Sequence, residues 1–212
     1  PDQGTYFSSF FAYMSYNYSS SHIRNNPKCI NADLYDMIPA SDVRKGFWAV
    51  TQAEMDAIDI PSNFRKYPYM NVKFNSPGSG TLGDGDVVLM RTAEMILIEA
   101  EANARLGVAN EVAARTALFS LVSQRDPNAV ISVNTGQALI DEILVQRRIE
   151  LWGEGFNFLD LKRANLPLQR STRGSFSLTQ ARITEMPAGD LQWQWFFPIG
   201  AINVNPNLVQ ND

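Results

Sequence analysis

The sequence has only one cysteine, Cys29, and one histidine among its 212 residues. An internal disulfide is therefore impossible, and a zinc site of clustered cysteine and histidine ligands is excluded. The neighbours of Cys29, Lys28 and Ile30, supply no recognisable setting for a catalytic thiolate, so we interpret Cys29 as a buried or incidental thiol. Long hydrophobic runs are also missing, and no apolar stretch has the length that a bilayer-spanning helix needs.

Excess positive charge is a further absence. Eighteen Lys and Arg face 22 Asp and Glu, for a net charge of -4 and a pI near 5.1. Nucleic acid and anionic membrane surfaces are therefore poor candidate partners. A signal peptide and a lipid-attachment cysteine near the start are lacking too. Because the chain begins at Pro1, we expect a C-terminal fragment or a processed chain of a longer protein.

The segment 138–163 dominates what is present. Its apolar residues recur at helical steps of three and four and predict one buried helix: Val145, Ile149, Trp152, Phe156 and Leu159. Charges on so apolar a helix need partners. We therefore expect an ion-pair lattice of Arg147, Arg148, Glu150, Glu154, Asp160 and Arg163. The three-residue spacings predict two pairs along the helix, Arg147 with Glu150 and Asp160 with Arg163.

This segment also carries a resemblance. The run QRRIELWGEGFNFLDLKR resembles the signature of the SusD/RagB-like family, the outer-membrane glycan-binding lipoproteins of Bacteroidetes nutrient-uptake systems. The matching residues are Arg147, Arg148, Glu150, Leu151, Glu154, Gly155, Asp160, Leu161 and Arg163. Gln146 and Asn157 stand where the family usually has Glu and Arg. The loss of one acid and one base together implies a lattice with one ion pair fewer.

Two further segments resemble the same family. Val87 to Gly107 predicts a helix that ends at a C-terminal glycine, and it is similar to a family helix at Arg91, Ala93, Glu94, Leu97, Ala100, Glu101 and Ala102. The following EVAARTALFSLVSQRD completes a helix-turn-helix of tetratricopeptide proportions. The chain end is similar to the family's terminal motif at Phe197, Pro198, Ile199, Ile202, Asn205, Pro206, Leu208, Gln210 and Asn211.

The pattern and the resemblance together imply a mainly α protein. We expect a tetratricopeptide-like helical scaffold, an α-α superhelix, with long irregular loops and minor short β pieces, forming the C-terminal part of a larger SusD-like domain. Within it, 1–86 would be a loop-rich ligand-side segment, 87–163 the repeat-like helices and 164–212 an extended C-terminal wrap. One helix pair cannot bury both its faces. This implies partners in a missing N-terminal half of the same protein, with the helix of 138–163 as an alternative partner.

The resemblance further implies a function without chemistry. The protein would bind an oligosaccharide or polysaccharide at the cell surface and deliver it to a SusC-like TonB-dependent transporter of the outer membrane. It would be lipid-anchored through an N-terminal part absent from this chain. Neither catalytic residues nor a cofactor are implied.

Ligand-binding candidates come from segments that mix aromatic and polar side chains. Aromatic rings pack on sugar C–H groups while amides and hydroxyls bond to sugar hydroxyls, which favours Tyr16, Tyr18 and Asn25. Trp48 is added because aromatics from roughly this region form part of the glycan platform in the family's starch-binding prototype. The alternative for all three rings is packing in a core.

Other functions stay open at this stage. The glycine-rich run 76–86 lacks the Gly-Lys-Ser/Thr ending of a phosphate loop, and Asp84 and Asp86 suit a helix N-terminus or, as a lesser possibility, a Ca²⁺ site. A glycoside hydrolase needs two carboxylates flanking the scissile bond, and Glu150 with Glu154 is the one pair that stands out. A peptide-binding tetratricopeptide scaffold is the third class.

Overall fold

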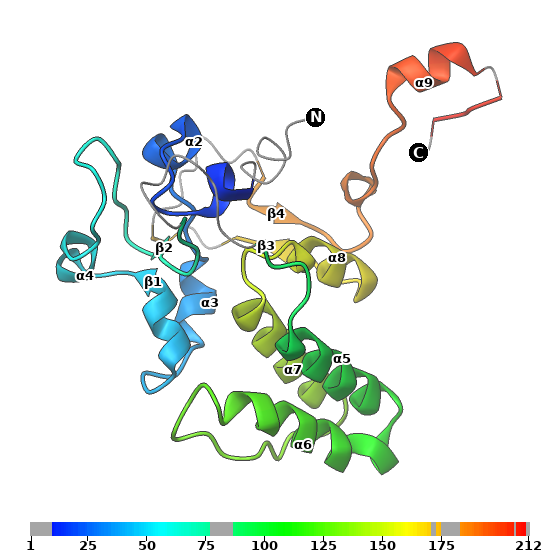
Figure 1. Ribbon diagram of the computed structural model, residues 1–212. Helices are drawn as coiled ribbons and strands as arrows, with labels where there is room; N and C mark the ends of the chain where they lie inside the picture. The colour runs from blue at the N-terminus through cyan, green and yellow to red at the C-terminus, as the bar shows by residue number, and fades with distance from the viewer. Residues whose placement is uncertain (1–9, 77–86, 171–172, 175–182, 206, 211–212) are drawn as a thin grey trace.

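The computed structural model describes residues 10–76, 87–170, 173–174, 183–205 and 207–210, and the candidate Ca²⁺ residues Asp84 and Asp86 lie outside them. Within these ranges helices dominate and strands are short, which confirms the mainly α class (Figure 1). In chain order the elements are α2 (Ser21–Asn25), α3 (Ala32–Asp36), η1 (Val43–Phe47), β1 (Trp48–Ala49), α4 (Gln52–Asp56), β2 (Met70–Asn71), α5 (Thr92–Arg105), η2 (Val108–Asn110), α6 (Glu111–Val122), α7 (Gly136–Glu150), α8 (Phe156–Arg163), β3 (Leu168–Gln169), β4 (Glu185–Met186), η3 (Leu191–Trp193) and α9 (Ile199–Val204). A helical turn also covers 10–14.

The helices α5, α6 and α7 form the main core, as Figure 1 shows. The predicted helix-turn-helix is confirmed: α5 ends just before Gly107, whose φ of 96° is a conformation that glycine adopts at little cost. Small residues on α5 and α6 let the two helices approach closely, and larger ones fill the space to α7. The buried members are Ala93, Leu97, Ala100, Ala104, Ala114, Ala117, Leu118, Leu121, Leu139 and Ile143.

The prediction of one continuous helix over 138–163 is wrong. The helix stops at Glu150 and restarts at Phe156. Gly153 and Gly155, with φ of 81° and 91°, lie in the intervening turn, and this left-handed region is where glycine is least strained. The chain therefore turns a corner between α7 and α8, which changes the charges of α8 that can reach those of α7.

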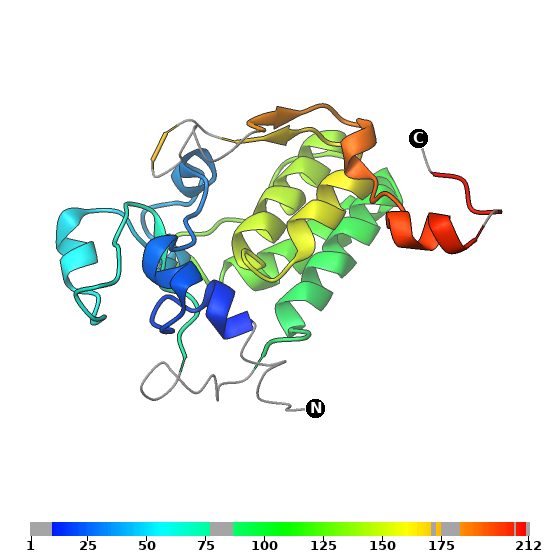
Figure 2. The same ribbon diagram turned by 90° about the horizontal axis from the view of Figure 1, so that it is seen from above.

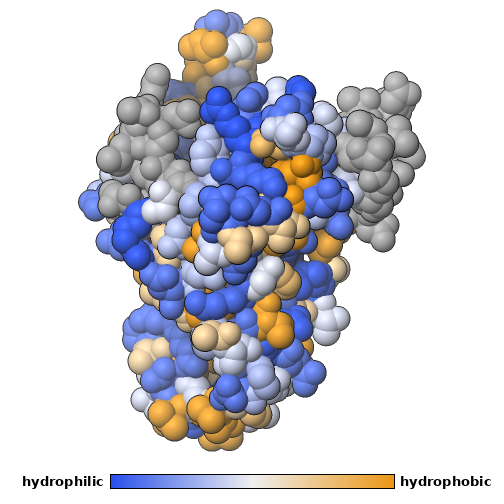
Figure 3. Space-filling model, turned by 90° about the vertical axis from the view of Figure 1, so that its left-hand side faces the viewer, coloured by the Kyte–Doolittle hydropathy of each residue, from blue (hydrophilic) through white to orange (hydrophobic). Residues whose placement is uncertain are grey.

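The loop-rich segment 10–76 packs against the C-terminal end of α7. Ile30, Leu34, Ile38 and Trp48 form a second core cluster with Ile149. The expectation of short β pieces is confirmed, because β2 pairs antiparallel with β1 in the register Trp48↔Asn71 and Ala49↔Met70. Figure 3 shows one face of the molecule, where hydrophilic residues are interspersed with smaller groups of apolar ones.

The segment 164–212, for which an extended wrap was expected, includes two paired strands and a separate helix. Strands β3 and β4 pair antiparallel, and Leu161 of α8 packs beneath them with Met186 and Trp193. Helix α9 instead projects away from the body, as Figures 1 and 2 show, and holds no buried residue. Among the described residues, no helix combines the length and the apolar character needed to cross a membrane.

Candidate ligand-binding site

Glu150, at the end of α7, is the centre of a buried charge cluster. Its carboxylate accepts from Arg91 Nη1 and Arg125 Nη2, both at 2.9 Å, and from Arg44 Nη1 at 3.4 Å. Arg44 is fully buried and also donates to Asp42, so it joins a second acid to the cluster. Burial by itself would raise the pKa of Glu150, but the hydrogen bonds from Arg125 and Arg91 outweigh it and lower the pKa to about 2.

Glu154 in the interhelical turn has partners other than the expected ones. It accepts from Lys73 Nζ at 2.7 Å and from Arg91 Nη2 at 2.8 Å. Lys73 also donates to the backbone carbonyls of Glu150 and Trp152 at 2.8 and 3.0 Å. These carbonyls lie at the end of α7 and just beyond it, where intrahelical donors are lacking. Lys73 therefore fixes the turn and Glu154 together.

The predicted pair of Arg147 with Glu150 is wrong, whereas Asp160 with Arg163 is confirmed. Arg147 Nε donates across the turn to Asp160 Oδ2 at 2.7 Å, and Arg163 Nε donates to Asp160 Oδ1 at 2.9 Å. Arg163 continues to Glu101 of α5 at 2.6 Å. Three bases from outside α7 donate to Glu150. Arg147 pairs instead with Asp160, which the turn between α7 and α8 brings near. The lattice is thus tertiary rather than helical.

Arg148 does not belong to this lattice. Within the described ranges it forms no ion pair, and its Nε is buried without a hydrogen-bond partner. One residue along a helix turns the side chain by about 100°, so Arg148 points to another side of α7 than Arg147. Arg148 lines a cavity facing the loop-rich segment. The prediction that Arg148 pairs within the lattice is therefore wrong.

The lattice also bears on the hydrolase alternative. The general acid of a glycosidase must be protonated near neutral pH, which requires a raised pKa. The pKa of Glu150 is instead lowered to about 2, so Glu150 cannot be that proton donor. Within the described ranges, no group of three or more histidine, cysteine, aspartate and glutamate side chains is placed to hold a metal ion.

The four predicted ligand residues do not form one surface. Trp48 is only 2% exposed and packs edge-on against Trp152, with ring centroids 5.7 Å apart. Because β1 and η1 turn the indole of Trp48 towards α7, the ring lies in the core. It therefore offers no flat surface to a sugar ring. Tyr16 packs partly buried against a different cluster around Met70. Tyr18 is half-buried and Asn25 is exposed at the end of α2.

A cavity that the sequence did not single out lies between α8 and the β3–β4 pair. It measures about 350 Å³, within the usual range for ligand pockets, and mixes aromatic, aliphatic and polar side chains: Asn157, Phe158, Leu161, Leu168, Arg170, Ile183, Met186, Gln192 and Trp193. The Phe158 and Trp193 rings lie 5.5 Å apart at 37°. Phe158 is 37% exposed whereas Trp193 is 4% exposed, so Phe158 is the ring available to a ligand.

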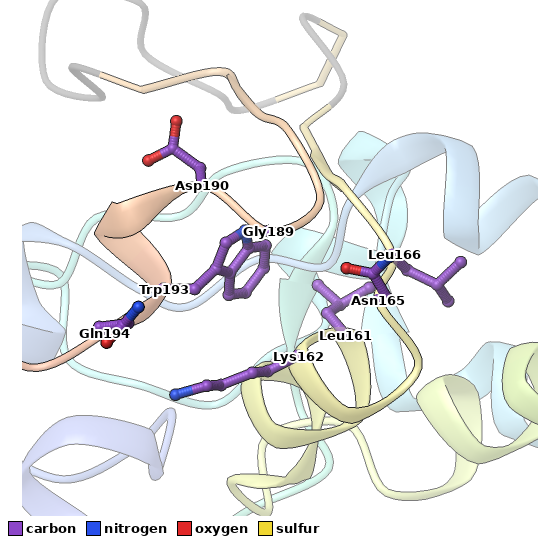
Figure 4. A pocket seen from close by; sticks show the side chains of 8 residues that line it. All are labelled: Leu161, Lys162, Asn165, Leu166, Gly189, Asp190, Trp193 and Gln194. Atoms are coloured by element: carbon purple, nitrogen blue, oxygen red, sulfur yellow. The ribbon is translucent and has the colours of Figure 1, made fainter. Parts of the chain in front are cut away.

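Trp193 also lines a smaller hollow of about 190 Å³, shown in Figure 4. The indole of Trp193 faces Leu161 in the figure, with polar side chains around it. Its Nε1 donates to the Pro187 carbonyl at 2.7 Å. The hollow is below the size of ordinary ligand pockets. Sequence periodicity could not reveal the larger cavity, because Arg170 and Gln192 come from a stretch without a regular pattern.

A helical scaffold of antiparallel pairs, with loops and short strands supplying a mixed aromatic and polar cavity, defines a class of binding protein. The sequence model of the SusD family matches residues 6–212, and the chain belongs to this family. A SusD-like protein of Formosa agariphila is 32% identical over 154 residues, which cover 69% of this chain and 27% of the relative.

Solved structures agree with this family. A SusD superfamily protein from Bacteroides thetaiotaomicron superposes with a TM-score of 0.67 at 27% identity, covering 87% of this chain and 40% of that one. A SusD-like carbohydrate-binding protein from Bacteroides vulgatus gives a TM-score of 0.62 at 28% identity, covering 81% and 34%. The chain thus spans well under half the length of these relatives.

Proposed function

We propose that the protein binds glycans as a component of an outer-membrane nutrient-uptake complex and performs no chemistry on them. The observation that carries this proposal is the family match over 6–212. It is supported by the similarity to a protein described as SusD-like and carbohydrate-binding. The low pKa of Glu150 also speaks against a glycosidase pair that uses Glu150 as its acid.

The partner and the location belong to the same proposal. The bound oligosaccharide would pass to a SusC-like TonB-dependent transporter. The protein would lie over this transporter as a lid at the cell surface. Attachment would be by a lipid on an N-terminal part that this chain does not include. Delivery to a transporter needs capture and release without bond cleavage, which is consistent with a cavity of partly exposed aromatic and amide groups.

Within the described residues we assign the sugar contact first to the cavity between α8 and the β3–β4 pair. Phe158 offers an exposed ring for sugar C–H groups, and Asn157, Arg170 and Gln192 offer hydrogen bonds around it. Tyr16, Tyr18 and Asn25 remain proposed contacts on the loop-rich segment, whereas the buried Trp48 is withdrawn from this role.

The test is native affinity electrophoresis of the protein in its full natural length through gels that contain plant, host and microbial polysaccharides. We expect retardation by at least one polysaccharide without release of reducing ends. Release of reducing ends would contradict a purely binding role. Normal mobility in every gel, together with no calorimetric heat from oligosaccharides of the same panel, would contradict glycan binding itself.

A further inference from the structure

A second cavity lies between α7, α8 and the loop-rich segment. Its volume is about 490 Å³, and its lining contains two bases but no aspartate or glutamate among the described residues: Met14, Lys28, Cys29, Asn31, Leu34, Arg148, Leu151, Trp152, Gly153, Gly155, Asn157 and Phe158. A concave site of this size with a net positive lining is suited to an anion.

Arg148 is the least compensated charge on this lining. Its Nε is buried and unpartnered, and burial lowers its pKa. Its neighbour Arg147 is paired with Asp160, and Arg91 and Arg163 are paired as well. Partial burial of a guanidinium without a counter-charge is costly. A bound anion would remove that cost and would account for an arginine held apart from the lattice.

The start of α8 adds backbone donors to the same cavity. Its N-cap residue is Gly155, which provides no side-chain hydrogen bond to the first turn. The first backbone N–H groups of a helix lack intrahelical acceptors and attract negative charge. Gly155 and Asn157 both line the cavity. The uncapped helix end and the uncompensated guanidinium therefore meet at one place.

Asn31 contributes in the same sense. Its Oδ1 is already occupied, because it accepts from the backbone N–H groups of Asp33 and Leu34 at 2.8 and 3.2 Å. Its amide nitrogen is the group left to offer a ligand, and it is a donor. Lys28 supplies further donors on the same lining. Hydrogen-bond donors thus converge on the cavity from both its walls.

We propose that this cavity binds the anionic group, a carboxylate or a sulfate ester, of an acidic sugar unit. The inference rests on the proposed glycan-binding function and assigns its ligand class as acidic saccharides. Trp152 and Phe158 on the lining supply aromatic surface for the sugar ring. Asn157 and Phe158 line the neighbouring cavity at the β3–β4 pair too, so one saccharide chain can occupy both.

The experiment is isothermal calorimetry on the protein in its full natural length, with glucuronate- and galacturonate-containing oligosaccharides, sulfated oligosaccharides and their neutral counterparts. We expect at least tenfold tighter binding of an acidic ligand than of its neutral counterpart. Arg148→Gln should weaken acidic binding about tenfold or more, and Lys28→Gln about threefold. Arg148→Lys should keep most of the affinity. Lys162→Gln, an exposed base elsewhere on α8, should change nothing.

The outcomes separate this inference from the function on which it rests. Binding of neutral glycans as strong as that of acidic ones, or acidic binding unchanged by Arg148→Gln, would overturn the assignment and leave glycan binding intact. A lower melting temperature of Arg148→Gln with unaltered affinity would show that Arg148 stabilises the fold without contacting the ligand, and would also overturn it. If Arg148→Gln does not fold, the Lys28→Gln and Arg148→Lys affinities decide.

Discussion

Arg147 of α7 donates its Nε to Asp160 of α8 at 2.7 Å, across the glycine-containing turn that separates the two helices. The same guanidinium lies 5.0 Å from the ring centroid of Phe156, the first residue of α8. These two contacts hold the corner between the helices. They also leave Arg148 and Glu150, which lie one and three positions after Arg147, to contact other parts of the molecule.

Replacement of Glu150 should strongly destabilise the protein. Glu150→Gln leaves Arg44, Arg91 and Arg125 without their shared carboxylate, and the loss of one partner of a buried ion pair costs about 3–5 kcal/mol. Urea denaturation at pH 7 measures the effect. Glu99→Gln on the exposed side of α5 is the matched control and should stay within about 0.5 kcal/mol; equal effects of the two would show that the lattice contributes nothing.

The same carboxylate gives a defined pH dependence. The pKa of Glu150 is lowered from 4.5 to about 2, so its stabilisation is complete above pH 4.5 and is lost as the pH falls towards 2. A difference of this size corresponds to about 3 kcal/mol. The unfolding free energies of the wild type and Glu150→Gln should therefore converge by about that amount between pH 7 and pH 2. A constant gap over this range would contradict the shifted pKa.

Trp48 and Trp195 should respond in opposite ways to truncation. Trp48 is 2% exposed, and removal of a fully buried tryptophan ring costs about 3–5 kcal/mol. Trp195 is 84% exposed, so its replacement by alanine should cost under about 1 kcal/mol. Thermal unfolding of both alanine variants is the measurement. A stable Trp48→Ala variant that has lost glycan affinity would restore Trp48 as a ligand contact.

Phe158 should matter for binding and little for stability. Phe158→Ala removes the exposed ring proposed to contact the sugar. This variant is expected to weaken glycan affinity by about tenfold, which corresponds to about 1.4 kcal/mol. The adjacent Leu159 is 60% exposed and lines neither of the two cavities assigned to the ligand, so Leu159→Ala is the control. Calorimetric titration with the polysaccharide found in the gels compares the two. Equal affinities for both variants would exclude the α8 cavity as the sugar contact.

Alanine substitutions at the two glycines of the interhelical turn should distinguish backbone strain from steric clash. Both have positive φ, but a Cβ on Gly155 would meet nothing within 4 Å, whereas one on Gly153 would lie 2.6 Å from Phe74 Cε2. Gly155→Ala should cost about 1–2 kcal/mol from backbone strain alone. Gly153→Ala should cost more, because Phe74 must also move. Denaturation midpoints check this order, and its reversal would show that the ring shifts without cost.

Local patterns predicted the elements of this fold better than their joints. The helix of Leu97 and the turn at Gly107 followed from apolar periodicity and from the terminal glycine, both of which are local signals. The corner at Gly153 did not follow, because Val145, Trp152 and Leu159 keep helical spacing through it. Periodicity reports which positions are apolar and cannot by itself distinguish one long helix from two that pack on the same core.

The candidate site was less predictable than the fold. Trp48 and Phe158 are both aromatic residues near helix or strand ends, and only the tertiary packing buries one and exposes the other. Asp160 with Arg163 was predictable because three residues separate them on one helix. Glu150 with Arg44 was not, since the pair joins positions 106 residues apart.

The wide separation of the partners of Glu150 has a consequence for the order of folding. Arg125 is 25 residues away, Arg91 59 and Arg44 106, and loop-closure entropy opposes contacts between such distant positions. The helix pair α5–α6 joins neighbouring segments and can form first. We therefore expect Glu150 to acquire its full set of bases only when all three segments have docked. Ion pairs that form after the folding transition state slow unfolding more than they speed folding.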